Sequence, residues 1–265
     1  MGKSIVVTSG KGGVGKTTCT ANIGSALADK GYSVVMIDAD IGLRNLDVVL
    51  GLENRIVFNV IDVAQGRCDL KKALVKDRRY DRLFLLPAAQ SVDKTAISPM
   101  QMQSICVELK EKFDYVIIDC PAGIEQGYKN SVAGADEAVV VTTPEIAAIR
   151  DADRIIGLLH SDGIYEPQLI INRIRPEMIK SGDMMSVPDI ESILGIRVVG
   201  LIPDDRAVVV STNRGEAAIK SFASAAAQEF RSIALRLSGE NVPLSEAWDK
   251  LGIGFMRKIF RTCFH

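Results

Sequence analysis

One stretch near the N-terminus decides the fold: Gly10-Lys11-Gly12-Gly13-Val14-Gly15-Lys16-Thr17-Thr18. It follows a short apolar run, precedes a helical pattern and contains the spacing G-x-x-x-x-G-K-[S/T]. The glycines let successive backbone N–H groups point at phosphate oxygens, and the start of the helix adds positive potential. In such a loop Lys16 reaches the β- and γ-phosphates and the Thr17 hydroxyl binds Mg²⁺. The stretch therefore predicts a nucleotide-binding phosphate loop, with a flexible glycine-rich turn as the alternative.

Short apolar runs alternate with helical patterns along most of the chain. Rich in Val, Ile and Leu, the runs are typical of parallel strands that helices cover on both faces. They are Ser4–Thr8, Val34–Asp38, Leu83–Leu86, Tyr115–Asp119, Ala138–Thr142, Gln168–Asn172 and Val198–Ile202. The main helical patterns are Lys16–Asp29, Pro99–Lys112, Ile146–His160 and Ala217–Leu237. This alternation predicts an α/β fold with a single doubly wound, mostly parallel sheet and helices on both faces.

Acidic residues end two of these strands, at the edge of the sheet where ligands bind. Asp119 ends an apolar strand, and we expect it to hold Mg²⁺ directly or through water. Asp38 and Asp40 flank Ala39, so their side chains share one face if the chain stays extended. One of the two is then placed to orient the attacking water and the other to support the metal. Each aspartate could instead cap the helix or turn that follows it.

Two later strand ends offer groups for the base of the nucleotide. Asn172-Arg173 ends one strand, and Pro203-Asp204-Asp205 ends the next. An asparagine side chain carries both a donor and an acceptor, which suits the edge of adenine. The sequence contains no Asn-Lys-x-Asp guanine signature, which favours ATP over GTP. Capping or turn roles are the alternative for Asn172 and Asp205.

The composition excludes several classes of protein. The chain has 265 residues, 47% hydrophobic and 25% charged, with a formal net charge of −1. These values are ordinary for a soluble globular protein and exclude disorder, collagen and coiled coil. We expect neither a transmembrane helix nor a signal peptide, since no apolar stretch reaches about 18 residues and little chain precedes Ile5. Five cysteines without a C-x-x-C pair predict free thiols in a reducing cytoplasm.

The C-terminus carries a different signal. We expect a phosphate-loop domain over residues 1–238, a connecting segment over 239–250 and an amphipathic tail over 251–265. As a helix, the tail has an apolar face with three phenylalanines and an opposite face that is basic or neutral, which is typical of an interfacial membrane helix. A final helix packed on the domain is the alternative. The expected membrane-contacting residues are Phe255, Met256, Arg257, Lys258, Ile259, Phe260, Arg261 and Phe264.

The phosphate loop, with its second lysine at position 11, resembles the deviant Walker A motif of the MinD/ParA ATPase family. The resemblance implies that Lys11 reaches across a nucleotide-sandwich dimer to the partner's phosphates, whereas a solvated loop lysine is the alternative reading. It also favours Asp40 as the water-orienting carboxylate and Asp38 as a support for Mg²⁺, and it places Asn172 and the Pro203–Asp205 segment at the adenine. Hydrolysis is expected to be slow unless stimulated.

The other segments that carry the resemblance span essentially the whole chain. They are Asp38-Ala39-Asp40, Asp119-Cys120-Pro121-Ala122-Gly123-Ile124-Glu125, Asn172-Arg173, Pro203-Asp204-Asp205 and the basic tail. Within the second of them, Gly123 is expected to let a switch segment move with the γ-phosphate.

The resemblance also implies a cellular role. It implies an ATP- and Mg²⁺-dependent homodimer that binds the inner face of the cell membrane through its tail and is otherwise cytoplasmic. Such a dimer positions the division site by recruiting a MinC-like inhibitor, and a MinE-like activator releases it. Partner contacts would include Asp151 and Asp153, although acids on a helix are usually just solvated.

Three related classes of ATPase are the rivals to this role. A ParA-type DNA-partition ATPase should show a basic surface, and we expect no nucleic acid because the net charge is near neutral. An iron–sulfur carrier should show paired cluster cysteines, typically C-x-x-C, which the sequence lacks. A flagellar-placement relative with a similar tail stays an alternative.

Overall fold

Eight strands form one sheet in the computed structural model, which describes residues 1–90 and 96–244. Their order across the sheet is β3-β4-β2-β5-β1-β6-β7-β8. Six strand pairs are parallel, and β3 alone of the described strands runs antiparallel, against β4. The strands are β1 (Lys3–Thr8), β2 (Val34–Asp38), β3 (Val75–Lys76), β4 (Leu83–Leu86), β5 (Tyr115–Asp119), β6 (Glu137–Thr142), β7 (Gln168–Ile174) and β8 (Val198–Pro203).

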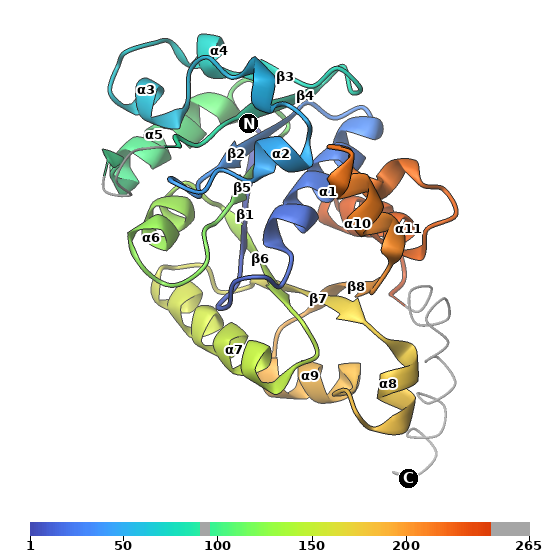
Figure 1. Ribbon diagram of the computed structural model, residues 1–265. Helices are drawn as coiled ribbons and strands as arrows, with labels where there is room; N and C mark the ends of the chain where they lie inside the picture. The colour runs from blue at the N-terminus through green and yellow to red at the C-terminus, as the bar shows by residue number, and fades with distance from the viewer. Residues whose placement is uncertain (91–95, 245–265) are drawn as a thin grey trace.

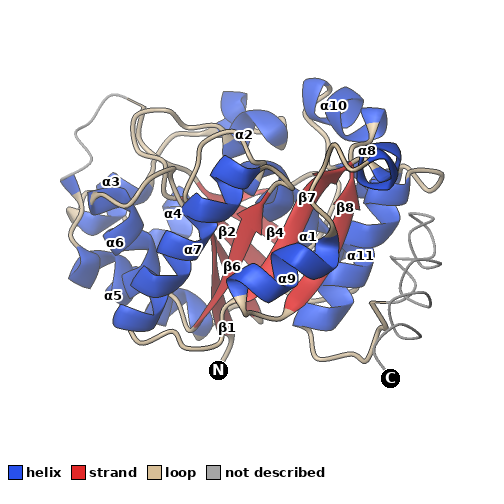
Figure 2. Ribbon diagram, turned by 90° about the horizontal axis from the view of Figure 1, so that it is seen from below, coloured by secondary structure: helices blue, strands red, loops and turns tan. Residues whose placement is uncertain are grey.

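Helices connect the strands and cover both faces of the sheet. Figure 1 shows α1 and α11 on one side of the strands and α7 and α9 on the other, and Figure 2 shows the strands between the two sets. The α-helices are α1 (Lys16–Asp29), α2 (Leu46–Val49), α3 (Val60–Ala64), α4 (Leu70–Ala73), α5 (Pro99–Lys110), α6 (Gln126–Ala133), α7 (Ile146–Ser161), α8 (Pro176–Ser181), α9 (Val187–Leu194), α10 (Arg206–Asn213) and α11 (Ala225–Leu237). Two 3₁₀ turns are η1 (Glu53–Arg55) and η3 (Ala218–Lys220). The doubly wound α/β prediction is confirmed.

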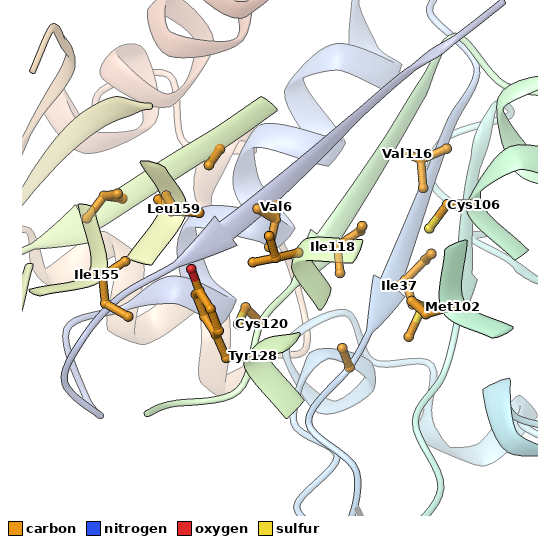
Figure 3. Close-up of a cluster of buried hydrophobic side chains, with 14 of the residues drawn as sticks. Val6, Ile37, Met102, Cys106, Val116, Ile118, Cys120, Tyr128, Ile155 and Leu159 are labelled. Atoms are coloured by element: carbon orange, nitrogen blue, oxygen red, sulfur yellow. The ribbon is translucent and has the colours of Figure 1, made fainter. Parts of the chain in front are cut away.

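The core consists of two apolar clusters, one on each face of the sheet. Successive strand residues point to opposite faces. In β1, Ile5 and Val7 join the cluster under α1 and α11, whereas Val6 joins the cluster under α5, α6 and α7. Figure 3 shows the second cluster, with Cys120 beside Tyr128. Burial raises the pKa of the Cys120 thiol to about 11, and this cysteine packs as a small apolar residue.

The prediction of one helix over Ala217–Leu237 is wrong, because η3 and α11 divide this stretch. The Ser224 side chain is the N-cap of α11 and accepts a hydrogen bond from the Ala227 N–H at 3.0 Å. Its hydroxyl also donates to Asp205 Oδ2 at 2.6 Å. These two bonds fix the start of α11 next to the start of α10. The residues directly before Ser224 are therefore not part of the α-helix.

The other predicted elements agree closely with the structure. Strand ends differ by at most two residues, and α5 ends at Lys110 rather than Lys112. The Ser98 and Gln101 side chains form a capping box at the start of α5.

A buried ion pair on α11 joins three segments. Arg236 Nη1 lies 2.7 Å from Glu229 Oε1, and both side chains are almost fully buried. Arg236 also donates to the carbonyl oxygens of Val199 in β8 and of Val242, each at 2.9 Å. Glu229 accepts a hydrogen bond from the Leu201 N–H of β8 at 3.1 Å. The pair therefore holds α11 and the segment after it against β8.

The predicted membrane-contacting residues, from Phe255 to Phe264, lie outside the described residues. The expected connecting segment over 239–250 is described only as far as Leu244. Within the described part of the chain, no helix combines the length and apolar character needed to cross a bilayer. The division into a domain, a connecting segment and a tail stays a prediction.

Candidate functional site

The phosphate loop lies between β1 and α1, at the carboxyl edge of the sheet. Gly13 and Gly15 have φ angles of 81° and 102°, which side-chain-bearing residues rarely adopt. A Cβ atom on Gly15 would lie 2.3 Å from Asn172 Nδ2, and one on Gly10 would lie 2.2 Å from the Asp151 carbonyl oxygen. The loop is therefore packed between β7 and α7 as well as bent, and glycine is required at both contacts.

The two lysines of the loop have different surroundings. Lys16, at the first turn of α1, is 8% exposed. Lys11 is about half exposed, and its Nζ lies 3.7 Å from Glu145 Oε2, at the start of α7. Lys16 therefore belongs to the interior of the site, whereas Lys11 lies at its surface in a weak ion pair.

Asp119 accepts hydrogen bonds from two hydroxyl groups of α1. Thr17 Oγ1 donates to Asp119 Oδ2 at 2.7 Å, and Thr20 Oγ1 donates to Asp119 Oδ1 at 3.2 Å. Thr17 is one of the predicted metal ligands, and the structure brings it together with Asp119. Thr20 was not predicted from the sequence, although threonines three residues apart on a helix lie on one face.

Asp38 lies directly beside Asp119, since the two are register partners in β2 and β5. Its carboxylate accepts hydrogen bonds from the backbone N–H groups of Asp40 at 3.0 Å and Leu46 at 3.1 Å. Burial, followed by the charge of Asp119, raises the pKa of Asp38, and burial raises the pKa of Asp119 as well. Two buried neighbouring carboxylates make a place where a cation is favoured.

The oxygen ligands at this place suit magnesium. A hydroxyl group and carboxylates are the hard ligands that Mg²⁺ prefers, and it usually keeps water and phosphate oxygens as further ligands. Among the described residues, no group of three His, Cys, Asp or Glu side chains is arranged to hold a metal alone. Thr17, Asp38 and Asp119 therefore fit a magnesium ion that arrives with a nucleotide.

Asp40 does not extend β2, because the strand ends at Asp38 and the chain turns there. The Asp40 carbonyl oxygen accepts hydrogen bonds from the N–H groups of Leu43 at 3.2 Å and Arg44 at 3.0 Å, and Arg44 has a φ of 42°. Asp40 thus starts a tight turn at the carboxyl end of β2. The expectation that an extended chain places Asp38 and Asp40 on one face does not describe this turn.

A cavity of about 220 Å³ lies at the expected base end of the site. The predicted residues Asn172, Arg173, Pro203 and Asp205 all line it. The other lining residues lie in the phosphate loop, in α1, after β8 and in α10. They are Gly15, Thr18, Asp204, Val208, Val209, Thr212 and Asn213. Helix α10 was not predicted from the sequence; its eight residues include three consecutive valines and none that is buried.

The side chains of Asn172 and Asp205 have structural partners in this cavity. Asn172 Nδ2 donates to the Val14 carbonyl oxygen at 2.8 Å and so supports the phosphate loop. Asp205 is the N-cap of α10, where its Oδ1 accepts from the Ala207 N–H at 2.8 Å. Asp205 therefore has the capping role that the sequence left open, while it also lines the cavity.

The segment after β5 contains a turn with a glycine in the left-handed region and an exposed isoleucine. Gly123 has a φ of 94°, and Ile124 is 44% exposed. On α7, Asp153 is exposed, whereas Asp151 is half-buried and its backbone contacts Gly10 of the phosphate loop. The helix expected to carry partner contacts thus packs directly against the nucleotide site.

Comparisons with known proteins agree with this geometry. A family model described as an AAA domain matches residues 2–161. The septum site-determining protein MinD of Bacillus subtilis (strain 168) is 55% identical over 261 residues, which are 98% of this chain and 97% of that protein. The MinD chain of a MinC:MinD cell division protein complex from Aquifex aeolicus superposes with a TM-score of 0.86 at 50% identity, covering 91% of this chain and 98% of that one.

A third similar structure contains a bound nucleotide. The septum site-determining protein MinD from Pyrococcus horikoshii OT3, complexed with Mg-ADP, superposes with a TM-score of 0.81 at 29% identity, over 89% of this chain and 96% of that one. Because identity exceeds one half over nearly the full length of a curated relative, the chain belongs to the MinD family of septum site-determining ATPases.

Proposed function

We propose that this chain binds ATP with Mg²⁺, hydrolyses it to ADP and phosphate, and uses the cycle to position the site of cell division. The observation that carries this proposal is the contact of Thr17, in the phosphate loop, with Asp119, beside Asp38. It joins phosphate-binding backbone to a pair of buried carboxylates at one edge of the sheet. The Mg-ADP bound by the Pyrococcus relative supports the same ligand here.

Each residue has a defined task in this reaction. The backbone N–H groups over 10–18 and Lys16 bind the phosphates, and charge that develops on the γ-phosphate is stabilised by these fixed donors. Thr17, Asp119 and Asp38 hold the magnesium ion, which neutralises phosphate charge. Asp40, at the turn after β2, orients the attacking water. Asn172, Arg173, Pro203 and Asp205 form the adenine end.

The surface around the nucleotide site supports the proposed dimer. Leu43, Ile124 and Ile146 lie on the segments that follow β2, β5 and β6, at the carboxyl edge of the sheet, and they are 67%, 44% and 65% exposed. Large exposed apolar side chains at one edge favour an interface. Lys11 lies at the same surface, where it can leave Glu145 for the phosphates of a second copy.

The partners and the membrane complete the proposal. The Aquifex structure contains MinC, which supports a MinC-like inhibitor as a partner, and α7 with Asp151 and Asp153 is a contact surface for it and for a MinE-like activator. Residues 251–265 bind the inner face of the cell membrane, and residues 239–250 connect them to the domain. A single amphipathic tail binds weakly, so two tails on one ATP-held dimer bind by effective concentration.

A liposome co-sedimentation assay with anionic vesicles tests this cycle. The full chain with Mg-ATP should pellet with the vesicles, the chain with Mg-ADP should stay in the supernatant, and a truncation at about Gly252 should stay in solution with either nucleotide. Phosphate release is measured in the same samples. Binding that is independent of ATP, or that survives truncation, contradicts the membrane cycle; absence of phosphate release contradicts the ATPase activity.

A further inference from the structure

Arg79 makes hydrogen bonds within its own turn and to two other segments at the edge of the sheet. It lies in the turn between β3 and β4, where its Nε and Nη2 donate to the two carboxylate oxygens of Asp77 at 3.2 and 2.8 Å. Its Nη1 donates to the Gly215 carbonyl oxygen at 2.5 Å, and its Nη2 also donates to the Leu50 carbonyl oxygen. The Asp77 side chain is 1% exposed, so the guanidinium is held in a fixed plane by a buried partner.

The two backbone segments that Arg79 joins are also in direct contact. A Cβ atom on Gly51 would lie 2.8 Å from the Gly215 carbonyl oxygen, and one on Gly215 would lie 2.8 Å from Gly51 Cα. Both glycines have a positive φ, 61° and 64°. The five residues Asp77, Arg79, Leu50, Gly51 and Gly215 therefore form one tight contact, which we name the Arg79 junction.

The segments that meet at the junction lead to opposite ends of the nucleotide site. Leu50 is the C-cap of α2, and the first N–H of α2, on Leu46, binds the Asp38 carboxylate. Gly215 follows α10, and its N–H donates to the carbonyl oxygen of Thr212, which lines the base cavity. One short path therefore runs from the base cavity through Arg79 to the carboxylate pair.

We propose that Arg79 is a positioning residue that couples occupation of the base cavity to the placement of α2 and the Asp38–Leu46 segment. The inference rests on the proposed nucleotide site. Arg79 itself is not part of the phosphate loop and does not line the base cavity. A base that stabilises α10 also holds Gly215, and through the guanidinium it holds Leu50. Linkage then requires that opening of α2 becomes less favourable when the base is bound.

Arg79→Lys is the informative substitution. Lysine keeps the charge, but its compact ammonium group cannot reproduce a planar fork that serves Asp77 and two carbonyl oxygens at once. Arg82→Lys is the matched control, because Arg82 lies in the same turn and its Nη1 donates to another glycine carbonyl, that of Gly31, at 3.1 Å. Gly31 lies beyond the end of α1, away from the junction.

Hydrogen exchange of the backbone amides over residues 46–52 measures the coupling. Magnesium ADP fills the phosphate loop and the base cavity, whereas magnesium pyrophosphate, at saturation, fills only the loop. In the unsubstituted chain and in Arg82→Lys, ADP should slow exchange over 46–52 at least about fivefold more than pyrophosphate does. In Arg79→Lys this extra protection should vanish while ADP still binds. A merely structural role of Arg79 would change exchange without a ligand and leave the ADP-to-pyrophosphate difference intact.

The outcomes separate the inference from the proposed function. If ADP does not bind the unsubstituted chain, the proposed nucleotide site is wrong. If ADP binds and Arg79→Lys retains the extra protection, or if the unsubstituted chain never shows it, the coupling by Arg79 is overturned. Should Arg79→Lys fail to fold, Gly215→Ala decides in the same experiment, because its Cβ separates the two glycine segments and should also abolish the extra protection; retained protection overturns the inference.

Discussion

Asp38, Asp40 and Asp119 lie at neighbouring strand ends, yet their surroundings differ. Asp119 is bound by two threonine hydroxyl groups of α1, and Asp38 is bound by two backbone N–H groups of its own loop. Asp40 starts the turn beyond β2, where its side chain is partly exposed. Asp38 and Asp119 are therefore fixed in place by these hydrogen bonds, whereas Asp40 lies in the tight turn that follows β2.

Asp40→Ala should separate hydrolysis from dimer formation. The substitution leaves the phosphate loop and the buried carboxylate pair unchanged, so the ATP-dependent dimer should persist on size-exclusion chromatography. Phosphate release should fall about 10²-fold or more, because the attacking water loses its orienting group. Asp81→Ala, which removes an exposed acid between β3 and β4, is the control and should hydrolyse normally. Normal turnover in Asp40→Ala would remove Asp40 from the catalytic residues.

Several site residues could not be found from the sequence. Thr20 and Arg79 act through contacts between segments far apart in the chain. The helical spacing of Thr17 and Thr20 is a local signal for Thr20, whereas no local pattern marks Arg79. Asp205 carries a strand-end signature, but only the structure shows that its carboxylate caps α10. Motif spacing identifies residues that bind a ligand through the backbone or a fixed loop, and it does not identify those that hold other residues in place.

The elements that were predicted and those that were missed differ in how they are stabilised. Buried parallel strands are continuous apolar runs, and long helices show a clear period, so β1 to β8 except β3, together with α1, α5 and α7, follow from the sequence. Helices of four to eight residues, such as α2 and α10, are too short for a periodic pattern. The break before α11 depends on the contact of Ser224 with Asp205, which tertiary structure creates.

The ion pair on α11 should contribute strongly to stability. Glu229→Ala leaves the Arg236 guanidinium buried without its carboxylate, and such a loss typically costs about 3–5 kcal/mol. Glu108→Ala breaks an exposed pair, in which Lys112 Nζ lies 2.5 Å from Glu108 Oε1, and should cost about 0.5 kcal/mol or less. Urea unfolding of both variants measures the difference. Equal losses would show that burial of the α11 pair does not matter.

Asp136 links the starts of two strands, and its effect should depend on pH. The Asp136 carboxylate accepts hydrogen bonds from Ser4 N and Ser4 Oγ, each at 2.9 Å, and from Lys110 Nζ at 2.7 Å. Partial burial alone would raise the pKa of Asp136, but these hydrogen bonds outweigh it and lower the pKa. A lowered pKa means that the carboxylate stabilises the fold above its ordinary pKa of 3.8 and that this stabilisation is lost as the pH falls through the folded value.

Asp136→Asn should therefore reduce the free energy of unfolding by about 0.5–1 kcal/mol at neutral pH, the smaller values reflecting solvent screening. The difference from the unsubstituted chain should shrink below about pH 4. Unfolding curves at several pH values check this. A difference that stays constant down to about pH 3 would mean that the ionised carboxylate is not the stabilising form.

At the scale of the whole molecule, the parallel topology assembles the site. Thr17 and Asp119 are 102 positions apart, yet they meet because β1 and β5 are neighbours and their carboxyl ends share one edge. This meeting could be predicted once the alternation of strands and helices was recognised. The base cavity could be predicted only in part, because α10 closes it from a segment without a motif.

Lys11→Ala should prevent the ATP-dependent dimer while leaving the single chain folded. Lys11 lies at the surface and forms only a long ion pair with Glu145, so its loss removes little from the monomer. Lys3→Ala is the control, because Lys3 forms a similar exposed pair with Glu137 at the opposite end of the strands. Light scattering with Mg-ATP should show a dimer for Lys3→Ala and a monomer for Lys11→Ala. A dimer in both would contradict the action of Lys11 across the interface.

The contacts of Arg236 and Glu229 with β8 have a consequence for aggregation. Because β8 is the last strand in the order of the sheet, its outer backbone groups have no strand of the described residues beside them and could pair with a strand of another molecule. The Arg236 guanidinium donates a hydrogen bond to the Val199 carbonyl oxygen, and the Glu229 carboxylate accepts one from the Leu201 N–H. Val199 and Leu201 lie two residues apart on β8. A strand of another molecule therefore finds neither backbone group available for a ladder hydrogen bond. The pair thus blocks the addition of a further strand at these two positions of β8.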